Sequence, residues 1–271
     1  MKLTRATLTW LFLAIVILPF VWIVFNSFKP GNEIISHPWS LPKSPNFANY
    51  VNAWTKSEFS KYFVNSLVTV IMTLAILIPI SAMASYVLAK FPFRGSKLIL
   101  SGFSAGMIVP QFLAIVPLFM LAQMLHLYNT QLGLILIYVA FSLPFTVFVL
   151  FGFFQILPDE LIESASVDGA SHAQTFWRVM LPLAKPGLLV ALIFNIIGLW
   201  NEYSLALVLI SDTDKYTMPV GMGRIMMTQQ YQGDWGALFA GMVIVMVPLM
   251  IVYFVFREKI QQTMVAGAVK G

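Results

Sequence analysis

The sequence lacks cysteine entirely and is poor in charge, because only 10% of its 271 residues are Asp, Glu, Lys or Arg. Without cysteine the chain has no disulfide framework, no thiolate zinc site and no cysteine nucleophile. Soluble domains carry about a quarter charged residues, so the scarcity of charge argues against a soluble protein. Hydrophobic residues make up 59% of the chain, which indicates a membrane protein.

Motifs of catalysis and metal binding are missing as well. The chain contains no GxxxxGK[ST] phosphate-binding loop, and no paired carboxylates or nucleophile arrangement stands out. Its three histidines, His37, His126 and His172, are isolated and form neither an HExxH pair nor a ligand cluster. We therefore predict a chain that is not an enzyme and that holds no metal or cofactor of its own. If it takes part in ATP-driven transport, the ATPase must be another polypeptide.

Long segments without charge predict an all-α membrane protein with six transmembrane helices in a single domain, residues 1–271. Residues 98–158 contain no charged residue and are too long for one span, so we divide them at the polar stretch His126–Gln131. The first apolar run is longer than the core of a signal peptide, so it is interpreted as a retained span. The predicted spans are about 6–28, 62–89, 98–125, 132–157, 184–210 and 235–256.

The positions of the basic residues predict the orientation of these spans. The formal net charge of +5 would suit a nucleic-acid partner, but the basic residues lie at the ends of apolar segments and form no single patch. Six spans place both termini on one side, and with that side in the cytoplasm ten basic residues lie inside and six outside. The short Lys90–Lys97 loop is the clearest case. We predict cytoplasmic N- and C-termini and no nucleic-acid partner.

A polar segment, 158–187, interrupts the apolar pattern and predicts two short helices joined by a glycine elbow. Pro158 suits a first helical position, and Gly169 suits the left-handed residue that ends a helix. Ser171 with Gln174 three residues later is typical of a capping box at the start of the second helix. The apolar face of that helix is predicted to consist of Ala173, Phe176, Trp177, Met180 and Leu181.

The same segment resembles the EAA loop of ABC importer permeases. The resemblance rests on Glu163-Ser164-Ala165, Asp168-Gly169-Ala170, Phe176 and Leu181-Pro182, with Ser164 standing where that family usually has alanine. It implies a type I ABC importer permease fold in which residues 158–183 form a cytoplasmic coupling loop. In that family the loop docks into a cleft on the ATP-hydrolysing subunit, with Glu163 seated in the cleft and Gly169 allowing a close fit.

Further blocks extend the resemblance over nearly the whole chain and narrow it to the sugar-importing branch. They are Ser27-Phe28-Lys29-Pro30, Asn65-Ser66-Leu67, Tyr86–Phe91, Leu143-Pro144-Phe145, Trp200–Tyr203 and Gly267–Gly271. The resemblance implies a multi-pass protein in the lipid of a prokaryotic inner membrane that imports a mono- or oligosaccharide. The implied partners are a second permease in a heterodimer, two ATPase subunits that hold ATP and Mg, and an extracytoplasmic sugar-binding protein. Loops 29–61 and 211–234 would meet the binding protein, and the tail 257–271 would touch the ATPase.

Polar residues inside the predicted spans are candidates for the translocation pathway. Glu202 lies within the fifth predicted span, where a carboxylate normally faces a bundle interior or a watery cavity. The alternative is hydration of Glu202 near the membrane interface, with Trp200 and Tyr203 as interfacial aromatic residues. Single amides more often bond helix to helix than line a path. The candidate pathway residues are Gln111, Asn195, Asn201, Glu202 and Tyr203.

Other functions remain open from the sequence alone. Within the ABC permeases, polyol and glycerol-phosphate importers are the alternative, although a phosphate calls for buried Arg or Lys in the pathway. An ion-coupled secondary transporter needs intramembrane ion ligands, for which Glu202 alone is weak support, and it would leave segment 158–187 unexplained. A non-transporting membrane scaffold would fit the composition, but it would not explain the prolines and polar residues inside the predicted spans.

Overall fold

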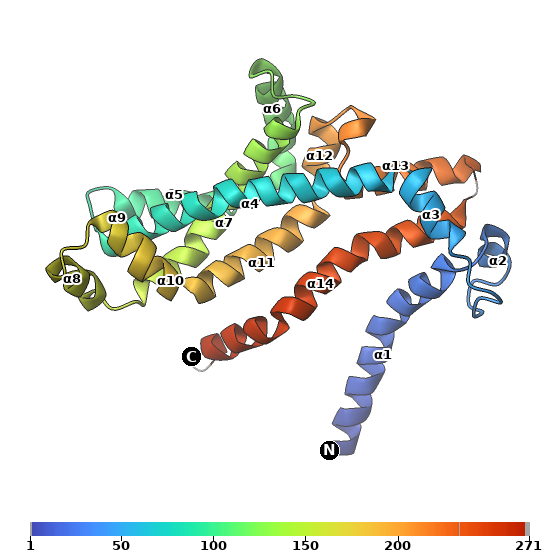
Figure 1. Ribbon diagram of the computed structural model, residues 1–271, viewed down its shortest axis with the longest axis horizontal. Helices are drawn as coiled ribbons and strands as arrows, with labels where there is room; N and C mark the ends of the chain where they lie inside the picture. The colour runs from blue at the N-terminus through green and yellow to red at the C-terminus, as the bar shows by residue number, and fades with distance from the viewer. Residues whose placement is uncertain (1, 233, 269–271) are drawn as a thin grey trace. The chain divides into compact units, whose positions relative to one another are not determined.

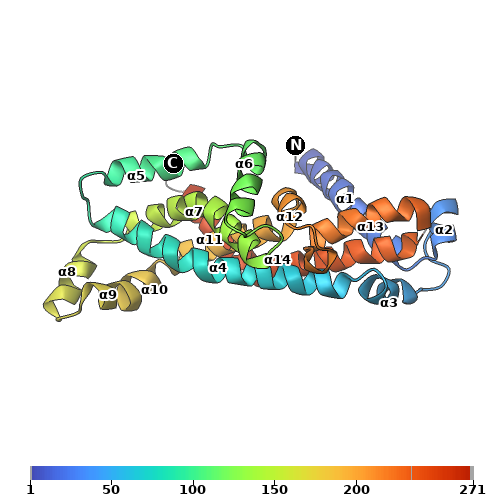
Figure 2. The same ribbon diagram turned by 90° about the horizontal axis from the view of Figure 1, so that it is seen from above.

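The computed structural model describes residues 2–232 and 234–268, and these residues contain helices and connecting segments but no strand (Figures 1 and 2). The predicted all-α class is therefore confirmed. The elements in chain order are α1 (Lys2–Ser27), α2 (Gly31–Ser36), α3 (Ala48–Thr55), α4 (Phe59–Lys90), α5 (Ser96–Gly106), α6 (Gln111–Met124), α7 (Gln131–Gln155), α8 (Glu160–Val167), α9 (His172–Thr175), a π-helical turn η1 (Phe176–Met180), α10 (Leu181–Leu183), α11 (Lys185–Asn201), α12 (Ser204–Leu209), a 3₁₀ turn η2 (Thr213–Lys215), α13 (Met218–Gln232) and α14 (Trp235–Ala268).

Four of the described helices are long and apolar enough to cross a membrane: α1 from Arg5, α4, α7, and α14 as far as Arg257. Two bent helix pairs satisfy the same test jointly. In one pair α5 and α6 meet at 101°, and in the other the helices of His172–Leu183 meet α11 at 73°. Counting each bent pair as one span gives up to six, the predicted number, although the second pair begins at His172, inside the predicted coupling loop, and not at residue 184.

Two predicted spans are not continuous helices. Residues 98–125 form α5 and α6 with a break at 107–110, where Pro110 has no amide hydrogen and disfavours helical geometry in the residue before it. Residues 184–210 form α11 and α12 with a break at Glu202, which has an extended conformation (ψ 124°). Beyond the sixth predicted span, the expected tail from Arg257 continues as helix α14 to Ala268.

The chain divides into two compact units, which we describe separately. The first unit comprises residues 1–64 and 216–251, and the second comprises residues 65–215 and 252–271. The predicted coupling loop and all the predicted pathway residues belong to the second unit.

In the first unit, a buried lysine ties the end of α1 to the segment around α2. The Lys29 ammonium donates hydrogen bonds to Asn26 Oδ1 (3.1 Å), His37 O (3.1 Å) and Pro38 O (3.3 Å). Pro38 O also accepts from Trp22 Nε1 at 2.8 Å. Burial lowers the pKa of the Lys29 ammonium, and the Glu33 carboxylate counteracts this effect. Three neutral acceptors match the three ammonium hydrogens, which is how a buried cation is tolerated here.

Replacing this lysine tests the tie. Lys29→Met keeps the length and apolar stem of the side chain, but it leaves Asn26 Oδ1 and His37 O without their ammonium donor. We expect a loss of about 2–4 kcal/mol, since each buried group left unsatisfied costs about 1–3 kcal/mol. Thermal unfolding of the detergent-solubilised protein measures the change. Lys43→Met, in the same connecting region but exposed and outside the tie, is the control and is expected to unfold like the wild type.

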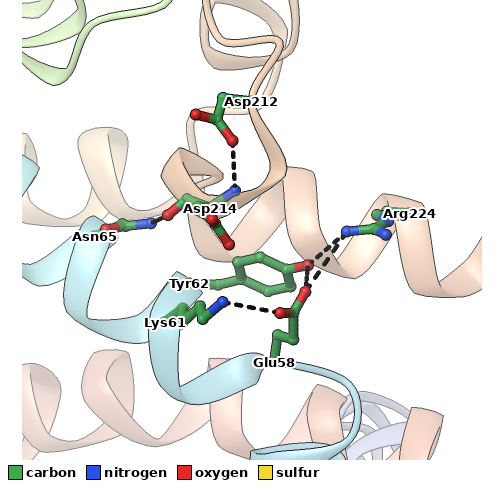
Figure 3. Close-up of polar contacts among 7 residues, drawn as sticks. All are labelled: Glu58, Lys61, Tyr62, Asn65, Asp212, Asp214 and Arg224. Atoms are coloured by element: carbon green, nitrogen blue, oxygen red, sulfur yellow. Dashed lines mark hydrogen bonds and ion pairs between the residues drawn. The ribbon is translucent and has the colours of Figure 1, made fainter.

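The first unit also holds a polar cluster at the start of α4 (Figure 3). Arg224 Nη1 donates to the Tyr62 hydroxyl at 3.1 Å, and that hydroxyl donates to Glu58 Oε2 at 3.4 Å. The Glu58 carboxylate also pairs with Lys61 Nζ at 3.0 Å and with Arg224 Nη1 at 3.7 Å. At Gly221 of α13 an added Cβ would lie 2.1 Å from the Tyr62 ring. Close packing and charge together therefore fix α13 against the start of α4.

In the second unit, the core lies where α4, α7, η1 and α11 meet. Its buried residues are Ala82, Tyr86, Leu150, Phe154, Phe176, Met180, Ala184 and Ala191. Ser85 Oγ of α4 donates to Val147 O of α7 at 3.0 Å, so a small residue allows a close helix contact. At Gly187 of α11 an added Cβ would lie 2.4 Å from the Phe153 ring of α7. These contacts make the scaffold that carries segment 158–187.

Candidate functional site

The predicted glycine elbow is present between α8 and α9. Gly169 has φ +78°, its amide donates to Ser166 O at 3.0 Å, and the Ala170 amide donates to Ala165 O at 2.9 Å. This pair of bonds is the Schellman arrangement that ends a helix with a left-handed residue. The capping box is also confirmed: Ser171 Oγ accepts from the Gln174 amide at 3.3 Å, and Gln174 Oε1 accepts from the Ser171 amide at 2.8 Å.

The start of the segment differs from the prediction. Helix α8 begins at Glu160, so Pro158 lies two residues before it and not at its first position. Asp159 is the residue that precedes the helix, but its side chain makes no capping bond. Instead, Asp159 Oδ1 bonds Lys90 Nζ at 2.6 Å, and Lys90 Nζ also donates to Leu157 O. The end of α4 is thereby joined to the chain as it leaves α7.

The second half of the segment is anchored by aromatic packing. The Phe176 ring lies 5.2 Å from the Tyr86 ring of α4 and 6.4 Å from the Phe154 ring of α7, measured between ring centroids. Met180, one turn further along, is fully buried in the same core. The elbow is therefore attached to helices α4 and α7 through a packed contact that can transmit movement as a rigid body.

The predicted apolar face of this half is wrong at two positions. Ala173 is exposed, and Trp177 is 51% exposed, whereas Phe176 and Met180 are buried as predicted. Trp177 lies in the π-helical turn η1, which is wider than an α-helical turn and changes the side-chain directions there, whereas Ala173 precedes that turn, in α9. Trp177 instead lines an apolar pocket of about 430 Å³, together with Met83 and His172.

The residues of the EAA-like loop divide into a group that faces the protein core and a group that faces outward. Ala165 and Phe176 face the protein core, and Leu181 is half-buried. Pro182 is exposed where the chain returns to α11. The outward group around the elbow is exposed and consists of Glu163, Ser164, Val167, Asp168 and Gly169, with Ala170 half-buried; Val167 is 88% exposed. Within the described part of the chain, neither Glu163 nor Asp168 forms an ion pair.

Glu202 and Gln111, two of the predicted pathway residues, lie in direct contact. Gln111 Nε2 donates to Glu202 Oε1 at 3.0 Å, and the Leu205 amide donates to the same oxygen at 2.8 Å. The other oxygen, Glu202 Oε2, accepts from the Tyr138 hydroxyl at 2.6 Å and from the Ala206 amide at 3.1 Å. The carboxylate therefore has four donors from three helices, and it is neither unpartnered nor simply hydrated.

The remaining pathway candidates are placed differently. Asn195 is buried and donates to Thr146 Oγ1 of α7 at 2.9 Å, which is the helix-to-helix bond that the sequence left as the alternative. Asn201 is exposed and donates to Ile197 O within its own helix at 2.8 Å. Tyr203 is half-buried beside Glu202. Tyr138 was missed from the sequence, since a tyrosine inside a charge-free span carries no signal of a carboxylate partner 64 residues away.

Comparison with known proteins identifies the class. A family model described as "Binding-protein-dependent transport system inner membrane component" matches residues 63–265. The chain belongs to this family of multi-pass membrane permeases, which are non-catalytic transport subunits. It is 46% identical over 253 residues to a diacetylchitobiose uptake system permease protein of Streptomyces coelicolor, covering 93% of this chain and 84% of that protein. It is also 32% identical over 266 residues to the trehalose transport system permease protein of Mycobacterium tuberculosis, covering 98% and 97%.

Solved structures confirm the ABC importer permease fold. A chain of a bacterial ABC transporter involved in the import of the acidic polysaccharide alginate matches with a TM-score of 0.86, at 21% identity over 95% of each chain. A chain of a bacterial alginate ABC transporter in complex with an alginate pentasaccharide-bound periplasmic protein matches with a TM-score of 0.58, at 17% identity. This match covers 94% of this chain and 96% of that one. At these identities the likeness concerns the fold.

Proposed function

We propose that this chain is one membrane subunit of an ATP-driven, binding-protein-dependent importer of a mono- or oligosaccharide. It would form half of the translocation pathway in a heterodimer with a second permease, with both chain termini in the cytoplasm. Two ATPase subunits, which hold the ATP and Mg, and an extracytoplasmic sugar-binding protein would complete the complex. Support for a carbohydrate cargo comes from relatives whose names specify diacetylchitobiose and trehalose uptake.

The observation that carries the coupling role is the construction of the α8–α9 elbow. On its outer side Glu163, Val167 and Asp168 are exposed to solvent, while Phe176 packs its inner side against α4 and α7. A partner that grips the exposed side and moves would therefore move packed helices rather than a loose loop. An exposed valine between two carboxylates also offers a partner both apolar contact and charge.

The structure also weighs against an ion-coupled secondary transporter. That reading depends on Glu202 as an intramembrane ion ligand, but both of its oxygens already accept two hydrogen bonds each. A carboxylate with all its strong acceptor positions occupied has little capacity left for a dehydrated cation. The ABC importer reading needs no such ligand in this chain.

Co-purification tests the proposal most directly. We would tag the chain, extract it gently in detergent, and identify the accompanying proteins by mass spectrometry. An ATP-binding subunit and a second permease are expected, and the purified complex in liposomes should hydrolyse ATP faster with a sugar-loaded binding protein. Labelled diacetylchitobiose and trehalose are the first cargoes to supply. Recovery of the chain alone or as a homo-oligomer would contradict the proposal.

A further inference from the structure

Two helix breaks in the second unit are joined by one carboxylate. Gln111 is the first residue of α6, directly after the 101° bend between α5 and α6. Glu202 occupies the break between α11 and α12. Their side chains meet at 3.0 Å although they lie 91 residues apart in the sequence. Figure 1 shows α6 and α12 as neighbours in the same part of the second unit.

The geometry at Glu202 makes this junction rigid. The amides of Leu205 and Ala206 at the start of α12 both donate to the carboxylate, where a helix favours negative charge. Tyr138, which is buried in α7, adds the shortest bond, at 2.6 Å. Removing the carboxylate would leave four donors without an acceptor, three of them on the buried residues Tyr138, Leu205 and Ala206, so the junction is costly to open.

Helix α12 is also held at its far end. The Asn129 amide, in the connection between α6 and α7, donates to Leu209 O at 2.8 Å. Its side-chain Oδ1 accepts from the amides of Ser211 and Asp212 at 3.2 and 3.0 Å. Both ends of α12 are thus bonded to the α6–α7 hairpin, one through Glu202 and the other through Asn129.

We infer that Glu202 is a positioning residue that holds the two helix breaks together in one junction. This junction, which we call the pivot, does not open during transport. Helices α6 and α12 then move as one body when ATP drives the permease between its two states. In this role Glu202 does not contact the sugar. The inference rests on the proposed import function, because it states how one part of the permease moves when ATP is used.

Isosteric substitution tests this role in the reconstituted complex. Glu202→Gln keeps the side-chain shape, but it replaces one acceptor oxygen with an NH₂ group that faces hydrogen-bond donors. We expect the number of sugars imported per ATP hydrolysed to fall about tenfold or more, with basal ATP hydrolysis retained. Tyr138→Phe and Gln111→Leu each remove one donor and should give smaller falls, and Glu202→Asp should recover part of the ratio.

The outcomes separate this inference from the proposed function. An unchanged sugar-to-ATP ratio in assembled Glu202→Gln complexes would overturn the pivot, as would a change in which sugar is accepted. If Glu202→Gln complexes do not assemble, the sugar-to-ATP ratio is measured in Tyr138→Phe and Gln111→Leu instead. A wild-type ratio in both of these variants would overturn the pivot. If the wild-type complex shows no sugar-stimulated ATP hydrolysis at all, it is the import proposal that fails.

A distance measurement tests the movement itself. The chain has no cysteine, so Leu113→Cys in α6 and Leu207→Cys in α12 provide spin-label positions, both exposed. Any cysteines in the partner chains are first replaced by serine, so that only these two positions carry labels. We expect the same label-to-label distance in nucleotide-free and in ATP–vanadate-trapped complexes, and a broader distribution with Glu202→Gln. A shift of several ångströms in the wild type between the two states would show that the junction opens, and would overturn the pivot.

Discussion

Gly169→Val is expected to abolish coupled uptake while the chain still inserts in the membrane. Gly169 has φ +78°, a region that costs an L-residue about 1–2 kcal/mol and is worst for β-branched side chains. Apart from its two neighbours in the chain, no heavy atom of the described residues lies within 4 Å of the Cβ that a substitution would add. The penalty is therefore backbone strain and not a clash. The elbow would relieve this strain by breaking its two Schellman hydrogen bonds. The angle between α8 and α9 would then change.

Gly169→Asn is the matched control, because asparagine tolerates the left-handed conformation better than any other residue with a side chain of that size. Uptake into liposomes and retention of the ATPase on the tagged permease measure both variants. If strain alone matters, Asn retains most of the activity that Val loses. If Asn is as harmful as Val, the partner itself needs a bare backbone at this point. Full uptake with normal ATPase retention in Gly169→Val would contradict the coupling assignment.

The elbow was predictable because its signals are local. A glycine after an apolar turn and a serine three residues before a glutamine specify a helix end and a helix start with little help from the rest of the fold. The structure reproduces both at Gly169 and at Ser171–Gln174. The number of candidate spans was predictable for a similar reason, since apolar length is read directly from the chain.

What the sequence did not show depends on distant residues. The partners of Glu202 come from positions 64 and 91 residues earlier, and nothing near Glu202 predicts them. Likewise, the Asp159 carboxylate bonds Lys90, which lies 69 residues earlier at the end of α4, and nothing near Asp159 predicts this partner. Trp177 was misplaced because periodicity assumes an α-helical turn, while the chain makes a π-helical turn. For Glu202 and Asp159, tertiary contacts decide where the side chain goes, and for Trp177 the local helix type does.

Phe176→Ala and Trp177→Ala form a matched pair that separates anchoring of the elbow from docking on it. The two residues are adjacent, with ring centroids 4.9 Å apart, but Phe176 is buried against Tyr86 while Trp177 is half-exposed. Removing a buried phenylalanine ring typically costs about 3–5 kcal/mol. Removing Trp177 mainly forfeits its contact with Phe176, worth about 0.5–1.5 kcal/mol.

We therefore expect Phe176→Ala to lower the unfolding temperature of the detergent-solubilised chain clearly and to raise amide hydrogen exchange across α8 and α9. Trp177→Ala should leave exchange in those helices close to wild type. In the full complex, Phe176→Ala should uncouple ATP hydrolysis from uptake, because a force applied at Glu163 or Asp168 no longer reaches α4 and α7 through a packed contact. If Phe176→Ala kept both the protection of α8 and the sugar-to-ATP ratio of the wild type, the elbow would be coupled to the spans by some route other than this aromatic anchor.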